Sequence, residues 1–266
     1  MEYINLKKHI AESDSKSLKR LPGFIISLLE KVIRQKSVNQ LLTSCDGHEG
    51  IAFLPRALDE LNIKVDIEGI ENLPDNGKCF FVANHPYGFV DGLILTSIVA
   101  KKYGDYRAIG NENFLLVPHI RPNIAAVNVF GTNPRTYLME LEKIYRSDMP
   151  ITHFPAGLVS RLKKGKVRDS DWQKSFIAKS SSCQRNIVPF HFTGRNSCVF
   201  YFIFLFRKAF RIKANLELSL LPHEIFTKRN KTIKVKIGKP LSYEMFDKSR
   251  SHLEWAQEVK DHIYTI

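Results

Sequence analysis

An alternation of strand-like and helix-like stretches from about residue 79 onward constrains the fold of this 266-residue sequence more than any other feature. Short apolar runs such as KCFFV, YRAIG and NIVPFHF are separated by longer stretches with helical spacing, such as DGLILTSIVAKKY and PRTYLMELEKIYRSD. Strands that alternate with helices are typical of βαβ units. The sequence therefore predicts an α/β fold with a mostly parallel central sheet flanked by helices, with functional loops gathered at one edge.

The first 59 residues have a different pattern. Over residues 16–43, apolar positions recur at helical spacing beside lysines and arginines, which predicts a basic amphipathic helix. The apolar positions are Leu21, Phe24, Ile25, Leu28, Leu29 and Val32. Such a helix either packs on the core or lies among lipid headgroups. We expect a helical, membrane-associating segment over residues 1–59, followed by one domain over residues 60–266 that opens with the strand-like IKVDIEG.

The charge and the cysteines narrow the class of protein. Forty Lys and Arg against 27 Asp and Glu give a net charge of +13, which favours an anionic partner such as nucleic acid or an anionic membrane. No nucleic-acid-binding motif is present, and the aromatic residues are not interleaved with basic ones as base-stacking platforms are, so we expect no nucleic acid partner. Four scattered cysteines without Cys-x-x-Cys spacing predict reduced thiols.

The lengths of the apolar runs indicate what kind of membrane contact the chain can make. None reaches the roughly 18 residues of a spanning helix, and the N-terminal stretch lacks the apolar core of a secretory signal. We therefore expect a peripheral protein at the cytoplasmic face of the inner membrane. One of the two longest runs, CVFYFIFLF at residues 198–206, fits a core element, a membrane-docking surface or the wall of an acyl-chain tunnel.

The stretch VANHPYGFVDGL, residues 82–93, is the strongest candidate site. Pro86 and Gly88 would break the strand that precedes them into a turn, and loops at strand ends are where α/β proteins carry their chemistry. His85 and Asp91 are then either a base with its orienting carboxylate, or a loop histidine and a helix N-cap.

Three blocks follow one another along the chain: NHPYGFVDG, FPAGLVSR and NIVPFHF. Together they resemble the PlsC-like glycerolipid acyltransferase superfamily, whose blocks read roughly Asn-His-x-x-x-x-Asp, Phe-Pro-Glu-Gly-x-x-Ser and an apolar stretch ending Val-Pro. The resemblance covers about residues 60–240 and is closest to the branch that acylates lyso-ornithine or related lyso-amino-acid lipids. It implies an O-acyltransferase that moves a fatty acyl group from acyl carrier protein or coenzyme A to the hydroxyl of a lysolipid, without a metal or another cofactor.

Two positions depart from the superfamily pattern. Five residues, not four, separate His85 from Asp91, and Ala156 stands where phosphatidate-forming enzymes usually have Glu. The second departure predicts a lyso-amino-acid lipid as the acceptor. The alternative acceptor is lysophosphatidic acid, which would make the chain a 1-acylglycerol-3-phosphate acyltransferase.

The resemblance also implies site residues. His85 would be the base and Asp91 its orienting partner. The residues expected at the substrates are Asn84, Arg135, Phe154, Pro155, Ala156, Gly157, Ser160 and Arg161. Asn84 fits a brace for the loop equally well. Arg161 opens the run RLKKGKVRD, which is either a solvated basic loop or a binding patch for the phosphate of an acyl carrier or lipid headgroup.

A histidine–aspartate pair suits acyl transfer from a thioester. A thiol of pKa ~8.5 leaves with little acid assistance, so the difficult step is removing the proton of the attacking alcohol. His85 would take that proton while Asp91 holds the opposite ring nitrogen, as in serine-protease triads. Two rival classes are a metal-dependent hydrolase that uses His85, Asp91 and another histidine as ligands, and a basic nucleic-acid- or membrane-binding protein without catalysis.

Overall fold

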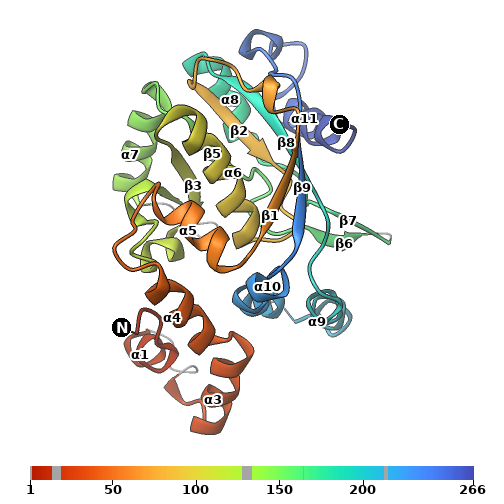
Figure 1. The fold of residues 1–266 in the computed structure, drawn as a ribbon. Coiled ribbons are helices and arrows are strands. Elements are labelled where there is room, and N and C mark those ends of the chain that lie inside the picture. Colours follow the sequence, from red (N-terminus) through yellow and green to blue (C-terminus); the bar gives the residue numbers. More distant parts are fainter. Residues whose placement is uncertain (1, 14–18, 128–133, 164, 213–214) are drawn as a thin grey trace.

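A computed structural model describes residues 2–13, 19–127, 134–163, 165–212 and 215–266 of the chain. Its centre is a seven-stranded sheet with the strand order β1-β9-β8-β2-β5-β3-β4, and a separate hairpin joins β6 to β7 (Figure 1). The strands are β1 Lys64–Glu68, β2 Cys79–Ala83, β3 Arg107–Asn111, β4 Ile124–Val127, β5 Ile151–His153, β6 Arg161–Lys163, β7 Lys166–Arg168, β8 Asn186–Thr193 and β9 Thr232–Ile237.

The sheet is mostly parallel, as predicted. Five neighbouring strand pairs run parallel, and only β8 and β9 pair antiparallel. Every residue of the central strand β2 is buried, as expected of a strand covered on both faces. Phe81 and Ala83 pack into one apolar cluster and Phe80 and Val82 into another, because successive side chains of a strand point to opposite faces.

Helices cover both faces of the sheet (Figure 1). The first cluster includes side chains from α4, α5, α6 and α10, and the second includes side chains from α7, α8 and α11. The helices are α1 Leu6–Glu12, α3 Gly23–Val32, α4 Gln35–Ser44, α5 Phe53–Glu60, α6 Phe89–Tyr103, α7 Arg135–Arg146, α8 Ser175–Cys183, α9 Cys198–Ala209, α10 Leu221–Thr227 and α11 His252–Ile263. The predicted architecture is confirmed.

The N-terminal region differs from the single helix predicted over residues 16–43. Arg34 has a left-handed backbone with φ of 51°, which ends α3 and turns the chain into α4; residues 14–18 lie outside the described part. The α4 side chains Val38, Leu41 and Leu42 join the first core cluster, whereas α3 exposes Phe24 and Leu28. Helix α4 therefore packs on the core, as one alternative predicted, and α3 has the exposed apolar side chains that the other alternative requires. The domain boundary at residue 59 stays a prediction.

The run at 198–206 forms helix α9, which lies beside the β6–β7 hairpin and α10. Its buried residues Phe200 and Tyr201 form a small third cluster with Val159 of the loop before β6 and Leu220 before α10. Within the described parts of the chain, no helix is both long and apolar enough to cross a membrane.

Candidate active site

His85 and Asp91 meet at the carboxyl end of β2. The strand ends at Ala83, and α6 begins at Phe89, so Asp91 is the third residue of the helix. Asp91 Oδ2 accepts hydrogen bonds from the backbone N–H groups of Tyr87 (2.7 Å) and Gly88 (3.0 Å), and it lies 3.1 Å from His85 Nδ1. Asp91 therefore satisfies the backbone at the helix start and partners the histidine at the same time.

Gly88 is required by the shape of this turn. Its φ is +83°, and a Cβ atom there would lie 3.0 Å from Leu221 Cδ2 and 3.3 Å from Val159 Cγ2. A larger residue would be strained in this conformation and would push against α10. The glycine thus lets the chain reverse tightly enough to place His85 over Asp91.

Burial sets the electrostatics of the pair. Asp91 is fully buried, and loss of hydration raises its pKa, while His85 and the two backbone N–H donors act in the opposite direction. The carboxylate holds Nδ1 of His85, whose ring stacks on Phe154 with centroids 4.0 Å apart. Nε2 is the ring nitrogen that remains for a substrate.

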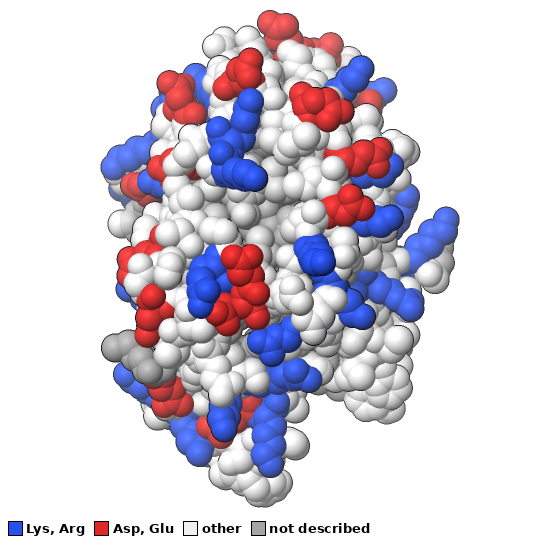
Figure 2. Space-filling view, in the orientation of Figure 1, with Lys and Arg blue, Asp and Glu red and all other residues white. Residues whose placement is uncertain are grey.

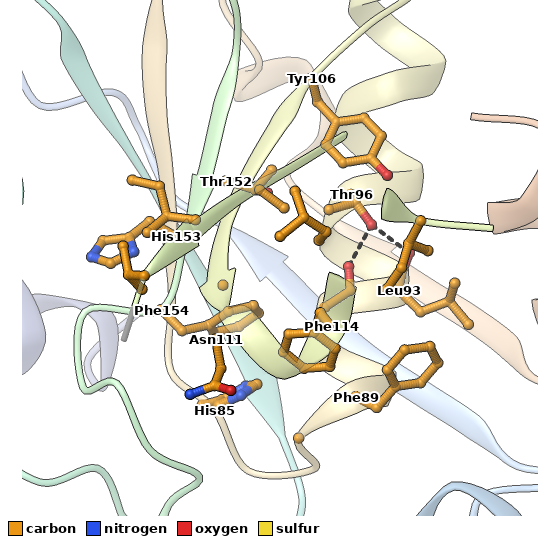
Figure 3. A pocket seen from close by; sticks show the side chains of 18 of the residues that line it. His85, Phe89, Leu93, Thr96, Tyr106, Asn111, Phe114, Thr152, His153 and Phe154 are labelled. Carbon is orange, nitrogen blue, oxygen red and sulfur yellow. Dashed lines mark hydrogen bonds between the residues drawn. The ribbon is translucent and has the colours of Figure 1, made fainter. Parts of the chain in front are cut away.

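An apolar pocket of about 890 Å³, including its open mouth, adjoins His85. Figure 3 shows His85 at one end of this pocket and Tyr106 with Thr96 at the other. Its walls come from α6, β3, β4 and the loop after β5, and they include Phe89, Gly92, Leu93, Ala108, Ile109, Phe114, Ile120, Ile124, Val127, Phe154 and Gly157. A pocket of this composition can hold a hydrocarbon chain, one end of which would lie beside the histidine.

The FPAG block is joined directly to the histidine loop. Ser160 donates its backbone N–H to the carbonyl of His85 at 2.8 Å. Asp169 accepts from the backbone N–H of His85 (3.2 Å), from Ser160 Oγ (2.5 Å) and from Trp172 Nε1 (2.9 Å). Burial raises the pKa of Asp169, and these donors oppose the rise. Two blocks that lie about 70 residues apart in the sequence thus form one unit.

Asp169 was missed by the sequence reasoning. It ends the basic run RLKKGKVRD, which was interpreted as either solvated or phosphate-binding. The available signal was an acidic residue at the end of a basic run, followed three positions later by Trp172. Only the folded chain shows that this carboxylate is buried beneath the histidine loop.

Two of the eight residues expected at the substrates line the pocket, and Pro155 and Ser160 support the loop beside it. Phe154 and Gly157 line it, and Gly157 has a φ of +67° in the turn closed by its N–H bond to the Phe154 carbonyl. The Pro155 carbonyl accepts from the Gln173 N–H at 2.9 Å, so this residue holds the loop in place. Ser160 is buried, and its hydroxyl is bonded to Asp169.

The other four expected residues do not line the pocket either. Asn84 uses its side-chain amide to exchange two hydrogen bonds with the backbone of Phe192 in β8, so it is a brace between strands. Ala156 is buried in the second apolar cluster and does not line the pocket. Arg161 is buried with Glu217 at 3.0 Å. Arg135 is exposed at the first turn of α7.

The fold and the site together have the arrangement of an α/β enzyme, with a histidine–aspartate pair at a strand end beside an apolar pocket. Residues 8–266 match the acyltransferase family, and the chain belongs to this family and is an acyltransferase. The family membership predicted from the three sequence blocks is confirmed.

Two curated relatives extend over nearly the whole chain. The lyso-glycine lipid O-acyltransferase of Phocaeicola vulgatus is 38% identical over 99% of this chain and 95% of its own length. The protein of the same name from Bacteroides thetaiotaomicron is 36% identical over 99% and 97%. The crystal structure of PlsC from Thermotoga maritima, a 1-acyl-sn-glycerophosphate acyltransferase, covers 98% of this chain and 86% of its own at a TM-score of 0.50 and 17% identity, which supports the fold alone.

Proposed function

We propose that this chain transfers a fatty acyl group from a thioester to the free hydroxyl of a lyso-amino-acid lipid of the lyso-glycine type. Two relatives that match almost end to end carry that activity in their names. The observation that carries the mechanism is the position of His85 at the mouth of an apolar pocket, with its Nδ1 3.1 Å from buried Asp91.

The pair performs general-base catalysis. His85 Nε2 removes the proton of the lysolipid hydroxyl as the oxygen attacks the thioester carbonyl, and Asp91 stabilises the imidazolium that forms. The new C–O bond gives a tetrahedral intermediate, which collapses by breaking the C–S bond. The departing thiolate takes the proton back from His85. The products are the acylated lipid and the free thiol, and the pair returns to its starting state.

Acyl carrier protein and coenzyme A are the two candidate donors. The net charge of +13 favours the acidic acyl carrier protein, because complementary charge speeds encounter and selects partners. A direct comparison of acyl carrier protein and coenzyme A thioesters carrying the same acyl chain decides between them. We place the enzyme at the cytoplasmic face of the inner membrane, where a lysolipid is within reach of a peripheral protein.

The acceptor choice now depends on the relatives and not on Ala156. The side chain of Ala156 packs inside the second apolar cluster, so its replacement of Glu does not by itself reshape the pocket. Both relatives are named for lyso-glycine lipid, whereas the likeness to the lysophosphatidate enzyme, at 17% identity, concerns the fold alone. Lyso-glycine lipid is therefore the acceptor to test first.

The test is a side-by-side assay with purified protein. With one acyl donor and one detergent, we expect a specificity constant at least tenfold higher for lyso-glycine lipid than for lysophosphatidic acid, roughly the effect of one mismatched polar contact. His85→Ala should lower turnover by ~10²–10⁴-fold with the fold retained by circular dichroism. Equal rates on the two lipids would contradict the acceptor, and more than half of the wild-type rate in His85→Ala would contradict the mechanism.

A further inference from the structure

Helix α9 has one buried and one exposed apolar face. Phe200 and Tyr201 pack inward. The outward face carries a stripe of Val199, Phe202, Leu205, Phe206 and Phe210, of which Phe202 and Phe210 are 68% and 66% exposed. The ring centroids of Phe202 and Phe206 lie 6.4 Å apart, and those of Phe206 and Phe210 lie 4.4 Å apart, so the aromatic stripe is continuous. Large exposed apolar patches on soluble proteins generally mark interaction surfaces.

A buried charge cluster fixes which face of α9 points outward. Glu217 is fully buried and lies 3.0 Å from Arg161 and 2.8 Å from Arg207 on α9. The Arg161 guanidinium also lies 5.3 Å from the ring centroid of Phe200 and 5.6 Å from that of Phe204. Rotating the helix would separate these ion pairs and leave charges buried without a partner, which is strongly unfavourable. The stripe is therefore held in solvent.

The same geometry bears on the three interpretations of residues 198–206, which were a core element, a membrane-docking surface and the wall of an acyl-chain tunnel. The pocket beside His85 is lined by residues of α6, β3, β4 and adjoining loops, and α9 supplies none of those described. The α9 stripe is thus a surface and not a tunnel wall. It is nevertheless close to the site, because Val159 of the cluster beneath α9, and Leu221 packed against that cluster, both approach Gly88 of the pocket.

The charges around the stripe indicate the kind of partner. Arg195, Lys208 and Arg211 are exposed just before, at the end of and just after α9. In Figure 2 the lobe formed by α9 at the lower right is white, and Lys and Arg side chains lie along its border toward the centre of the view. An aromatic face flanked by cations is the composition of a helix that lies in the interface of an anionic bilayer.

We propose that the outward face of α9 docks on an anionic lipid bilayer, with Phe202, Phe206 and Phe210 entering the boundary between headgroups and acyl chains. Docking there would bring the membrane next to the loop that carries His85. This proposal rests on the lipid substrate proposed above. Binding to vesicles is measured without any acyl transfer, so the docking surface and the proposed reaction are tested separately.

The first experiment is flotation with vesicles of phosphatidylglycerol and phosphatidylcholine. The triple variant Phe202→Ser, Phe206→Ser, Phe210→Ser should reduce the partition coefficient on anionic vesicles by roughly tenfold or more, since three apolar rings are lost from the interface. The matched control is Leu138→Ser, Met139→Ser, Leu253→Ser, three residues exposed by about half on α7 and α11. The control should bind like the wild type. Equal binding by the triple variant and the wild type overturns the proposal.

A second experiment reports depth and does not require a loss of binding. Both native tryptophans, Trp172 and Trp255, are buried, so Phe206→Trp adds one exposed reporter. On anionic vesicles its emission should shift to the blue and be quenched by lipids brominated in the upper acyl chain, consistent with burial of roughly 5–10 Å. Leu138→Trp on α7 should show neither change. A Phe206→Trp spectrum that does not respond to vesicles also overturns the proposal.

The other possible occupant is a second copy of this chain. Sedimentation of wild-type protein without lipid tests it directly. A dimer that the triple variant converts to a monomer would assign the stripe to self-association and overturn the proposal. A monomer in both cases, together with the loss of vesicle binding, supports it.

Discussion

Asp169 is a buried carboxylate that accepts hydrogen bonds from three different segments beneath the histidine loop. Its side chain does not line the pocket and reaches the site only through the residues that it holds, so we describe it as a positioning residue. It fixes the backbone N–H of His85, while Ser160 holds the His85 carbonyl from the same side. Catalytic geometry of this kind needs to be held within fractions of an ångström, which a second layer of hydrogen bonds provides.

We predict that Asp169→Ala lowers kcat by roughly tenfold or more and changes KM for the lysolipid little, because His85 loses its alignment while the pocket is unchanged. It should also lower the midpoint of thermal unfolding, since unsatisfied buried donors cost ~1–3 kcal/mol each. Steady-state kinetics and calorimetry measure both effects.

Asp169→Asn keeps one acceptor oxygen and should recover part of the rate. Asp171→Ala, at a neighbouring side chain that is 86% exposed, is the control. A KM effect without a kcat effect would argue against positioning.

His153 gives a prediction about pH. It ends β5 against Phe176, and burial lowers its pKa from 6.5 to about 4. The folded protein therefore keeps His153 neutral, while the unfolded chain binds a proton below pH 6.5. Its contribution to stability is present above that value and is lost as the pH falls toward 4, with a slope of at most ~1.4 kcal/mol per pH unit.

We predict that His153→Gln loses less stability than the wild type between about pH 7 and about pH 5, because the titrating group is gone. Urea unfolding at the two pH values measures the difference. His252→Gln, at an exposed position at the start of α11, should keep the wild-type dependence. An unchanged slope in His153→Gln would show that other groups dominate the acid response.

At the scale of elements, α6 connects the two parts of the site. Its first turn carries Asp91, and the next residues on the same helix, Gly92, Leu93 and Thr96, form one wall of the pocket. Thr96 donates to the carbonyls of Gly92 and Leu93 and so hides its hydroxyl from the apolar interior. In the mechanism that we propose, the helix would align the reacting end of an acyl chain with the histidine and shield the rest of the chain from water.

We predict that Gly92→Leu reduces transfer of long-chain acyl groups by roughly tenfold or more and preserves transfer of short-chain ones, because a leucine side chain enters the pocket between His85 and its far end. A Cβ at position 92 meets only Phe154, at 3.9 Å, so the backbone accepts the substitution. Gly92→Ala should behave like the wild type. Competition between long- and short-chain thioesters measures the preference. An equal loss for both chain lengths would mean that the pocket does not hold the acyl chain.

At the scale of the whole molecule, α3 and α9 project at the same end (Figure 1). Helix α3 exposes Phe24 by 75% and Leu28 by 58%. We therefore predict that α3 makes the membrane contact expected of the N-terminal segment, because α4 packs into the core. Two apolar faces on one body can meet a single membrane surface together.

We predict that Phe24→Ser with Leu28→Ser weakens binding to anionic vesicles. When these substitutions are combined with the α9 triple variant, the two fold-reductions of the partition coefficient should multiply, because insertion free energies at separate sites add. Flotation of the two variants and their combination gives the three partition coefficients. A substitution pair is preferable to deleting residues 1–43, which would remove Val38, Leu41 and Leu42 from the core. No further loss in the combined variant would mean that α3 and α9 do not contact the membrane at once.

Local sequence patterns predicted the alternation of strands and helices from residue 79 onward, the mostly parallel sheet that such alternation implies, and the turn that carries His85 and Asp91. These features depend on residues that are close in the chain: apolar spacing selects the element, and Pro86 with Gly88 sets the turn. The three sequence blocks were enough to predict the family. The break at Arg34 was not predicted, because α3 and α4 separate only when one helix packs on the core and the other does not.

Only the tertiary structure decided which side chains reach the pocket. Arg161 looked like a substrate ligand, but its partner Glu217 lies 56 residues further on and buries it. Nothing in the sequence singled out Asp169, but in the fold its carboxylate lies 3.2 Å from the backbone nitrogen of a residue 84 positions earlier. Burial and charge pairing arise between segments that meet at the sheet edge, and the energy of such contacts depends on the desolvation that the whole fold imposes. The residues next to Arg161 and Asp169 in the sequence do not reveal these contacts.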